Sequence, residues 1–355
     1  MANNSYRSTN SSNFNQQRGP RPYDFVYFST KSPSVNKPPG HHKYLHERIH
    51  GTLFLTLKVQ TMVHISTGTV LMGSDINREE IPLIKTMVQG IDDELIIQGS
   101  SLKGCIRSIY EAITNSRVGV KPKKPSEYPE ERLPAKEKNQ LCPASIVFGA
   151  SGDRWGWQGL VSIQDAYCEM TGFEVGFMSN LWRPRPEEND IYYFKDKSGK
   201  KKAVGWKFYY NMKYALDKGE GNGVPAQVAF KNDEFITQLN FRNLKSEELG
   251  ALLIALGQDN KYPIILKLGA GKPVGLGSMI VEITEADLLQ NQSDLRTRYS
   301  SFERLSNQFL TGESLKIFIG NTVQKAHENL IDKSKLEELS NILNPSTHFA
   351  PHESY

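Results

Sequence analysis

The segment Gly99-Ser100-Ser101-Leu102-Lys103-Gly104 combines two hydroxyl groups and a lysine at the start of a stretch with helical periodicity. The first four backbone amides of a helix lack intrahelical acceptors, and the positive end of the helix dipole lies there. The segment therefore predicts a site for phosphate or another anion. The alternative is an ordinary helix start, in which Ser100 or Ser101 caps the free amides. The segment lacks the final Gly-Lys-Ser/Thr of a nucleotide-binding P-loop.

A second candidate for chemistry is the loop GAGKPVGLGS, in which Gly269, Gly271, Gly275 and Gly277 fall within nine residues. Glycine at this density lets another backbone approach closely. The loop precedes a strand-like run and does not open a helix after a strand, so it is not a dinucleotide-binding fingerprint. Two interpretations remain: contact with a phosphate or ribose, with Lys272 as the charge, or a structural bulge at the entry to the strand.

The elements that carry these segments follow from the spacing of apolar residues. Expected strands lie at residues 51–65, 95–97, 160–163, 235–244 and 279–283, and expected helices begin near residues 102, 246, 294 and 336. Residues 66–94 are expected to form a hairpin or a long loop. This order predicts an α+β fold, a ferredoxin-like or RRM-like β-α-β-β-α-β sandwich with large insertions and a helical C-terminal appendage.

Charge and composition divide the chain into segments. The net charge is +4, but residues 1–60 carry eight basic and two acidic residues, so the remaining 35 basic and 37 acidic residues sum to −2. Residues 182–213 carry nine basic and four acidic residues interleaved with aromatic ones. The expected domains are a flexible basic arm at 1–50, a main domain at 51–290 with insertions near 115–140 and 182–230, and a helical extension at 291–355. The arm is rich in Asn, Ser, Gln, Pro and Gly, and its aromatic residues are expected to dock on the body or to stack on nucleobases.

Four segments occur in an order that resembles the repeat-associated mysterious protein (RAMP) superfamily. They are GSSLKGCIRS, CPASIVFG followed by GLVSIQDA, LNFRNLKSEELGALLIAL, and KLGAGKPVGLGSMIVEI. Within the superfamily, the chain resembles the backbone subunits of type III CRISPR effector complexes, especially those of the subtype D branch. The resemblance extends from about Tyr23 to Ile283, which is most of the chain.

This resemblance implies a CRISPR-associated subunit that binds guide RNA (crRNA), positions it with target RNA, and assembles with sibling RAMP subunits and a large subunit. Such a ribonucleoprotein acts in antiviral defence. The resemblance implies that Ser100, Ser101, Lys103 and Arg107 face the guide backbone and that the glycine-rich loop with Lys272 lies against the same RNA. It also implies a thumb hairpin that separates guide from target at regular intervals.

The resemblance raises the question of catalysis. In the family, an aspartate after the first strand cuts target RNA with a divalent metal. Counting back from Pro82-Leu83-Ile84-Lys85, Glu80 takes that position, and Asp75 lies five residues earlier. The longer glutamate side chain displaces the carboxylate from the geometry of in-line attack. The leading hypothesis is a non-catalytic RNA-binding subunit, and the alternative is Mg²⁺-dependent cleavage through Asp75 or Glu80. A third hypothesis is processing of precursor guide RNA with His64 as the base.

The cysteines and the apolar runs of the chain bear on metal sites, cofactors and membrane location. Cys105, Cys142 and Cys168 lie far apart without a Cys-x-x-Cys spacing, so neither a disulfide framework nor a zinc site is expected. Larger relatives carry zinc fingers near CPASIVFG, but Ser145 stands where a second cysteine would be. We expect no structurally bound cofactor, and Mg²⁺ only if the subunit cleaves RNA. No run approaches about 18 apolar residues and the start has no apolar signal core, which predicts a cytoplasmic protein without a membrane partner.

Overall fold

The fold is organised around one large antiparallel sheet. The computed structural model describes residues 21–171, 174–181, 190–216, 222–289, 292–300 and 309–346. Within these residues the sheet has the strand order β16-β17-β2-β15-β9-β5, with β8 also paired to β15 and β18 to β17. Its strands are β2 (Ile49–Val59), β5 (Glu94–Ile97), β8 (Val161–Ile163), β9 (Ala166–Thr171), β15 (Glu234–Leu244), β16 (Leu266–Lys267), β17 (Ser278–Leu289) and β18 (Phe309–Leu310).

The centre of this sheet has the predicted β-α-β-β-α-β topology. Along the chain come β2, helix α1 (Gly99–Ile113), β8 and β9, β15, helix α3 (Ser246–Ala255) and β17. In space, β17, β2, β15 and β9 are successive neighbours, and each pair is antiparallel. The first and third strands are thus central and the two helices connect strands that are not adjacent, as in a ferredoxin-like sandwich. The predicted fold class is confirmed.

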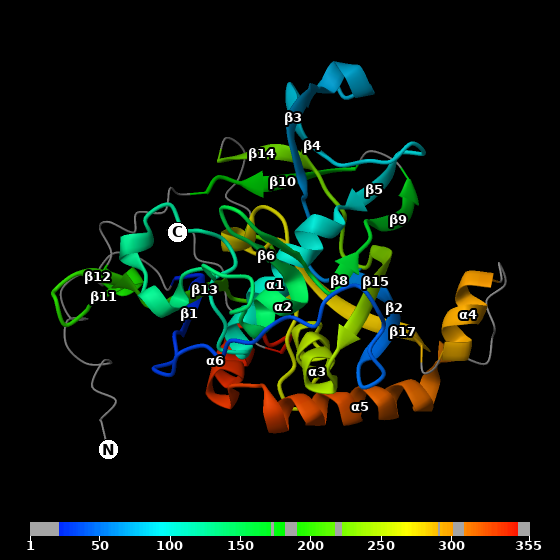
Figure 1. Cartoon of the computed structure of the whole chain (residues 1–355). Coiled ribbons are helices and arrows are strands. Elements are labelled where there is room, and N and C mark those ends of the chain that lie inside the picture. Colours follow the sequence, from blue (N-terminus) through cyan, green and yellow to red (C-terminus); the bar gives the residue numbers. More distant parts are fainter. Residues whose placement is uncertain are drawn as a thin grey trace.

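Burial follows the periodicities seen in the sequence. In β2, Leu53, Leu55 and Leu57 are buried in the core while Lys58 is exposed. In α1, the five apolar positions of the predicted stripe are all buried, namely Leu102, Ile106, Ile109, Tyr110 and Ile113. Helices α1 and α3 pack together, and α5 (Gly312–Asn329) packs on α3 and runs along the lower edge of the molecule in Figure 1. The sheet and its helices therefore enclose a single main core.

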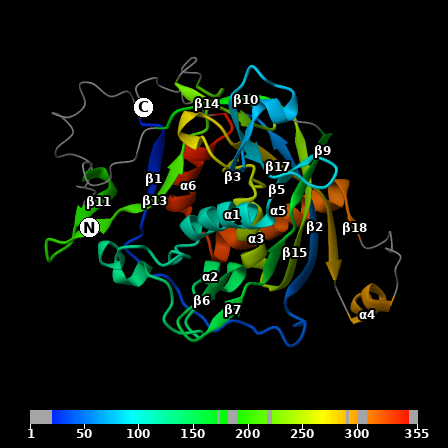
Figure 2. The same cartoon turned by 90° about the horizontal axis from the view of Figure 1, so that it is seen from above.

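The C-terminal helices at residues 312–329 and 333–343 contribute side chains to this core, whereas no side chain at residues 293–300 is buried. Besides α4 (Gln292–Ser300) and α5, the chain forms α6 (Lys333–Leu343), whose Leu336, Leu339 and Leu343 are buried. Figure 2 shows α6 beside β1 (Tyr23–Tyr27) and β13 (Gly205–Tyr209), which pair with each other. The spacing of Leu295, Tyr299, Phe302, Leu305 and Phe309 predicts a helix that continues through residue 309. This prediction is wrong at Phe309, which lies in β18 with its ring 6.2 Å from that of Phe54, and Phe302 and Leu305 lie outside the described residues.

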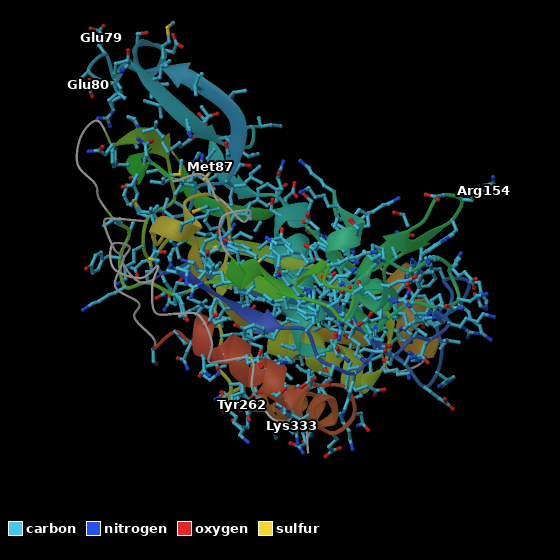
Figure 3. The ribbon with its side chains drawn as sticks, turned by 90° about the vertical axis from the view of Figure 1, so that its left-hand side faces the viewer. Glu79, Glu80, Met87, Arg154, Tyr262 and Lys333 are labelled. Carbon is cyan, nitrogen blue, oxygen red and sulfur yellow. The ribbon has the colours of Figure 1, made fainter. Side chains whose placement is uncertain are left out.

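A long hairpin projects from the body, as Figures 1 and 3 show. It consists of β3 (Ser66–Met72), a 3-10 turn (Gly73–Ile76) and β4 (Leu83–Met87). Its base joins β14 (Gly223–Gln227) and β10 (Val175–Ser179) in a second sheet of order β10-β14-β4-β3. Residues 66–94, predicted as a hairpin or a loop, therefore contain a hairpin, which we call the projecting hairpin (residues 66–87).

The remaining helix and strands of the described chain are short. They are α2 (Pro143–Phe148), the pair β6 (Gly149–Ser151) and β7 (Gly156–Gln158), and the pair β11 (Tyr193–Lys195) and β12 (Lys201–Ala203). The sequence predicts neither α2 nor these short pairs. Of the basic segment 182–213, residues 182–189 lie outside the described residues.

The described parts of the arm and of the 115–140 insertion are tied together by Arg132. The Pro, Lys and Glu content of residues 115–139 predicts an exposed loop, but the Arg132 side chain is fully buried. Its guanidinium donates to the backbone oxygens of Ser29 and Lys31 at 2.6 and 3.0 Å and to Asn115 Oδ1 at 2.6 Å. It also lies 5.2 Å from the centre of the Phe28 ring. Hydrogen bonds and an aromatic face replace the water that a buried cation loses, which is why this position is compatible with burial.

Candidate functional site

The start of helix α1 is capped by the carboxylate of Asp165, which lies in the connection between β8 and β9. Its N-cap is Gln98, and no side chain of the segment itself caps the helix. Instead, the Gly99 amide donates to Asp165 Oδ1 at 2.7 Å. Ser100 is exposed and Ser101 is half-buried, and neither serine hydroxyl makes a hydrogen bond within the described part of the chain. Capping by a serine is therefore wrong, and the outermost amide of the predicted anion site already holds the Asp165 carboxylate.

The side chains of the GSSLKG segment divide between two faces of α1. Ser101, Cys105 and Ser108 recur at helical spacing on a face that lines a cavity. Lys103 and Arg107 lie on a different face. The Lys103 ammonium donates to the carbonyl oxygen of Val161 at 2.9 Å, and Arg107 Nε donates to Glu111 Oε1 at 2.7 Å. The structure thus brings Ser101 to the cavity and engages Lys103 and Arg107 in contacts within the protein.

All four glycines of the glycine-rich loop (residues 269–278) are required by backbone geometry. Gly269, Gly271, Gly275 and Gly277 have φ angles of 76°, 70°, 98° and 86°, a region that side-chain-bearing residues rarely adopt. A Cβ atom at Gly277 would also overlap the carbonyl oxygen of Leu268. The loop therefore does serve as a structural strand entry, and this role accounts for the glycines without excluding contact with a ligand.

The two predicted segments meet at one cavity of about 380 Å³. Helix α1 forms one wall, the glycine-rich loop and the end of β16 form a second, and β13 with the end of α6 forms a third. The lining residues are Ser101, Cys105, Ser108, Ile109, Lys207, Phe208, Tyr209, Lys267, Leu268, Gly269, Lys272 and Leu343. Of the sequence-predicted binding residues, the structure brings Ser101, Gly269 and Lys272 together here.

Three lysines line this cavity, and two of them, Lys267 and Lys272, lie at the glycine-rich loop. The Lys272 ammonium donates to the carbonyl oxygen of Gly269 at 2.7 Å, and the Lys267 ammonium donates to Ser278 Oγ at 3.0 Å. Burial, reinforced by the neighbouring Lys272 charge, lowers the pKa of Lys267 to about 7, and burial also lowers the pKa of Lys272. Among the described residues, no carboxylate forms an ion pair with either ammonium group.

Sequence reasoning missed Lys267. The available signal was its position directly before the glycine-rich loop, in KLGAGK, where it sits at the same edge as Lys272. In the sequence Lys267 resembles an ordinary strand residue. In the structure its side chain is only 8% exposed. Because its burial depends on α1 and β17 packing over it, local sequence did not reveal that it lies in the site.

Lys207, in the basic segment, is held by contacts with tyrosine side chains. Strand alternation buries Phe208 in the core, which places the neighbouring Lys207 side chain on the opposite face of β13. There the ammonium lies 3.7 Å from the centre of the Tyr23 ring and 4.9 Å from that of Tyr209, and it donates to Tyr192 Oη at 3.0 Å. Burial lowers the pKa of Lys207 to about 8. This part of the segment fixes β13, whose residues close the cavity.

The carboxylates considered for catalysis lie at the far end of the projecting hairpin. Asp75 is in the 3-10 turn and Glu80 follows it, and both side chains are exposed. Figure 3 shows Glu79 and Glu80 at the tip, remote from Lys333 at the opposite end of the molecule. The described residues contain no group of three or more His, Cys, Asp or Glu side chains that would hold a metal ion.

His64, considered as a base for guide processing, is completely buried at the base of the hairpin. Its Nδ1 lies 2.8 Å from the carbonyl oxygen of Gln227, and its Nε2 has no hydrogen-bond partner in the described chain. Burial lowers the pKa of His64 below its usual value. An imidazole without solvent contact does not reach the 2′-hydroxyl of a bound RNA, so the structure gives this hypothesis no support.

Comparison with known proteins identifies the family. Residues 56–280 match the RAMP superfamily, and because this is more than half of the chain, the chain belongs to that superfamily. No curated protein matches the sequence. Among solved structures, the crystal structure of Thermofilum pendens Csc2 matches with 12% sequence identity, covering 82% of this chain and 81% of that chain, at a TM-score of 0.33. Among the described residues, no helix is long and apolar enough to cross a membrane.

Proposed function

We propose that this chain is a guide-RNA-binding backbone subunit of a type III CRISPR effector complex. Its membership of the RAMP superfamily supports the class, and the order of the four sequence segments supports the subunit type. The observation that carries the proposal is the meeting of α1 and the glycine-rich loop at a cavity where, among the described residues, no carboxylate pairs with Lys267 or Lys272. Cations and free hydroxyl donors hold phosphates without reading base sequence, as a subunit that accepts any guide requires.

The projecting hairpin is the proposed thumb between guide and target. Val70, Met72 and Leu83 lie on one face of it, because Met72 pairs with Leu83 and Val70 lies two residues before Met72. Each of the three side chains is more than half exposed. Apolar side chains on a narrow hairpin that reaches away from the body are suited to insertion between base pairs. Sibling RAMP subunits and a large subunit are the proposed protein partners.

The test compares two serine-to-glutamate variants of the full chain. Ser101→Glu places a carboxylate at the cavity, and Ser334→Glu places one at the exposed start of α6. Both serines lie in the first turn of a helix, where glutamate is favourable to the helix dipole, so both variants are expected to fold. Binding of two fluorescently labelled RNAs of guide length and unrelated sequence is measured by anisotropy.

The expected result is equal affinity of the wild type for the two RNAs and a loss of about tenfold in Ser101→Glu, which corresponds to ~1.4 kcal/mol. Ser334→Glu should bind within about twofold of the wild type, because its carboxylate is remote from the cavity. Absence of RNA binding by the wild type, or strong preference for one RNA sequence, would contradict the proposed function.

A further inference from the structure

Two segments that lie far apart in the chain form one lysine-rich surface. They are the loop at residues 121–128 and the hairpin β11–β12 at residues 193–203, which together carry eight lysines and two acidic residues. The hairpin packs on the 3-10 turn Pro125–Glu127 of the loop, and Figure 1 shows it at the left of the molecule, away from the projecting hairpin. We call residues 121–128 and 193–203 the lysine surface.

The two segments of the lysine surface are fixed to each other by hydrogen bonds. The Lys202 ammonium donates to the carbonyl oxygens of Ser126 and Tyr128 at 2.8 and 3.1 Å. In the same place Tyr193 Oη donates to Glu127 Oε2 at 3.1 Å. Lys202 therefore serves as a structural link, and the other lysines are carried on a supported surface and not on a free tail.

Both carboxylates of the lysine surface are used within it. Glu127 Oε1 accepts from the Lys124 ammonium at 3.0 Å, and Asp196 Oδ1 accepts from the amides that close the hairpin turn. Beyond the surface, Glu130 pairs with Lys136 at 3.3 Å. Five exposed lysine side chains make no ion pair or hydrogen bond within the described part of the chain, namely Lys121, Lys123, Lys195, Lys197 and Lys200. Their positive charge is left for a partner.

The hairpin also places like charges opposite each other and exposes an aromatic ring. Lys195 lies directly opposite Lys201 in the register of β11 and β12, an arrangement that is unfavourable in the absence of an anion. Phe194 is 39% exposed, and the Lys201 ammonium lies 5.9 Å from the centre of the Tyr193 ring. Phosphates offset such charges, and an exposed ring stacks on unpaired bases. The combination favours a single nucleic-acid strand over an acidic protein segment, which has no base to stack on Phe194.

The lysine surface is connected to the wall of the cavity. Strand β12 leads through Val204 into β13, and Phe208 of β13 lines the cavity. The six residue steps from Lys202 to Phe208 span at most about 20 Å of extended chain. A strand of RNA held at the cavity can therefore continue over the lysine surface.

We propose that the lysine surface is a second RNA-binding surface of this subunit, which holds the backbone phosphates of a single-stranded stretch that continues from the cavity. This inference rests on the proposed function, and it adds a surface outside the cavity and the class of strand that the surface takes. The exposed lysines neutralise phosphates and Phe194 stacks on a base. Neither contact reads base sequence.

The experiment compares the double variant Lys197→Met/Lys200→Met with the matched control Lys316→Met/Lys333→Met. Each removes two exposed lysines and changes the net charge equally, and the control lysines lie on α5 and α6, outside the lysine surface. A third variant, Phe194→Leu, removes the ring and retains an apolar side chain. Binding of the two labelled guide-length RNAs to the full chain is measured by anisotropy at several salt concentrations, and circular dichroism confirms that each variant is folded.

The expected result for Lys197→Met/Lys200→Met is a loss of about tenfold in affinity for both RNAs, with a salt slope reduced by about 1.4 because two phosphate contacts with a single strand are lost. The control should bind within about twofold of the wild type with an unchanged slope. Phe194→Leu should lose about fivefold at an unchanged slope, because stacking does not release counterions.

Three outcomes would contradict the inference. Equal affinities and salt slopes of the lysine-surface variant and its control, with intact wild-type binding, would overturn the inference and leave the proposed function standing. Competition by polyglutamate that is as effective as competition by RNA at equal charge would do the same, because the occupant would then be an acidic protein segment. Failure of the wild type to bind either RNA would overturn both.

A second measurement needs no variant. The wild type is photocrosslinked to the same RNAs with 4-thiouridine at every uridine position, and the modified peptides are identified by mass spectrometry. Adducts within residues 193–203 support the inference. Adducts at the cavity with none in the lysine surface overturn it, while the proposed function stands.

Discussion

The cavity and the projecting hairpin, two regions proposed to contact RNA, are built in opposite ways. Around the cavity, side chains are buried or half-buried, glycines are fixed by close backbone contacts and Lys267 is 8% exposed. On the hairpin, Val70, Met72 and Leu83 are exposed and the turn charges lie in solvent. The cavity therefore depends on the packing of the whole domain, whereas the hairpin needs only its base to be anchored.

The base of the projecting hairpin is anchored by polar contacts. At the base of the hairpin the Thr69 and Thr86 hydroxyls lie 2.9 Å apart, and the Met87 amide donates to Gln227 Oε1 at 2.9 Å. Beyond this point the hairpin strands have only each other and β14. Substitutions at the tightly packed positions around the cavity should therefore reduce stability as well as binding, whereas substitutions on the exposed face of the hairpin should leave stability almost unchanged.

The largest expected effect is a difference in lost stability between alanine substitutions of two glycines that have the same φ angle. Gly277 and Gly68 both have a φ of +86°, but a Cβ at Gly277 would overlap the Leu268 carbonyl oxygen, whereas Gly68 on the hairpin has open space. Gly277→Ala should destabilise the protein by about 3 kcal/mol or more, and Gly68→Ala by about 1 kcal/mol, the cost of the strained φ alone. Urea unfolding of the two variants measures both values, and equal losses would contradict the contrast between the regions.

The next effect concerns the pH dependence of stability. The pKa of Lys267 is about 7 in the folded protein and 10.5 without burial. Between these values the unfolded chain holds a proton that the folded chain lacks, so this residue makes the free energy of unfolding rise with pH, by at most ~1.4 kcal/mol per pH unit. Lys267→Met should abolish that contribution, while Lys333→Met should retain it. Urea titrations from pH 7 to 9.5 without RNA check this, and an identical slope in both variants would argue against the buried ammonium.

A smaller effect on stability is expected on the hairpin. Met72→Ser and Leu83→Ser should each change the free energy of unfolding by less than about 0.5 kcal/mol, because both side chains are more than half exposed and pack little against the body. Binding of the two guide-length RNAs by the full chain should remain within about twofold of the wild type. In an assembled complex, the double variant should weaken target RNA binding more than guide retention. Loss of guide retention alone would show that the hairpin is part of the guide site.

The smallest effect is expected at the hairpin tip. Asp75→Ala and Glu80→Ala should leave target cleavage by the assembled complex unchanged in the presence of Mg²⁺, because both carboxylates are exposed and no metal-binding group surrounds them in the described chain. Mapping the cleavage products by gel electrophoresis tests this. The disappearance of one cut among several spaced cuts would instead establish the metal-dependent nuclease alternative.

The fold was largely predictable because its signals are local and repeated. The alternation in β2, the apolar stripe of α1 and the order of the elements along the chain all predict the ferredoxin-like core. The short helix α2 was not predicted because its six residues are buried on every side, which leaves no periodicity. Arg132 was placed in an exposed loop because a charged residue among prolines predicts solvent exposure, and its many acceptors come from distant segments.

The candidate site was predictable only in part. The sequence located both backbone segments that border the cavity, since glycines and a helix start leave local signals. It did not separate Ser101 from Lys103 and Arg107, because those contacts depend on Val161 and Glu111. It also did not show that His64 is buried.

By itself, the sequence determined the order and type of the main elements, the family resemblance and the two segments from which a site is built. Only the tertiary structure decided which side chains of those segments share a cavity, that Asp165 caps α1, and that Lys267 joins Lys272 without a carboxylate partner. The reason is the distance along the chain over which each physical effect acts. Propensity and periodicity act over a few residues, whereas desolvation and charge pairing depend on groups that the fold brings together from distant parts of the chain.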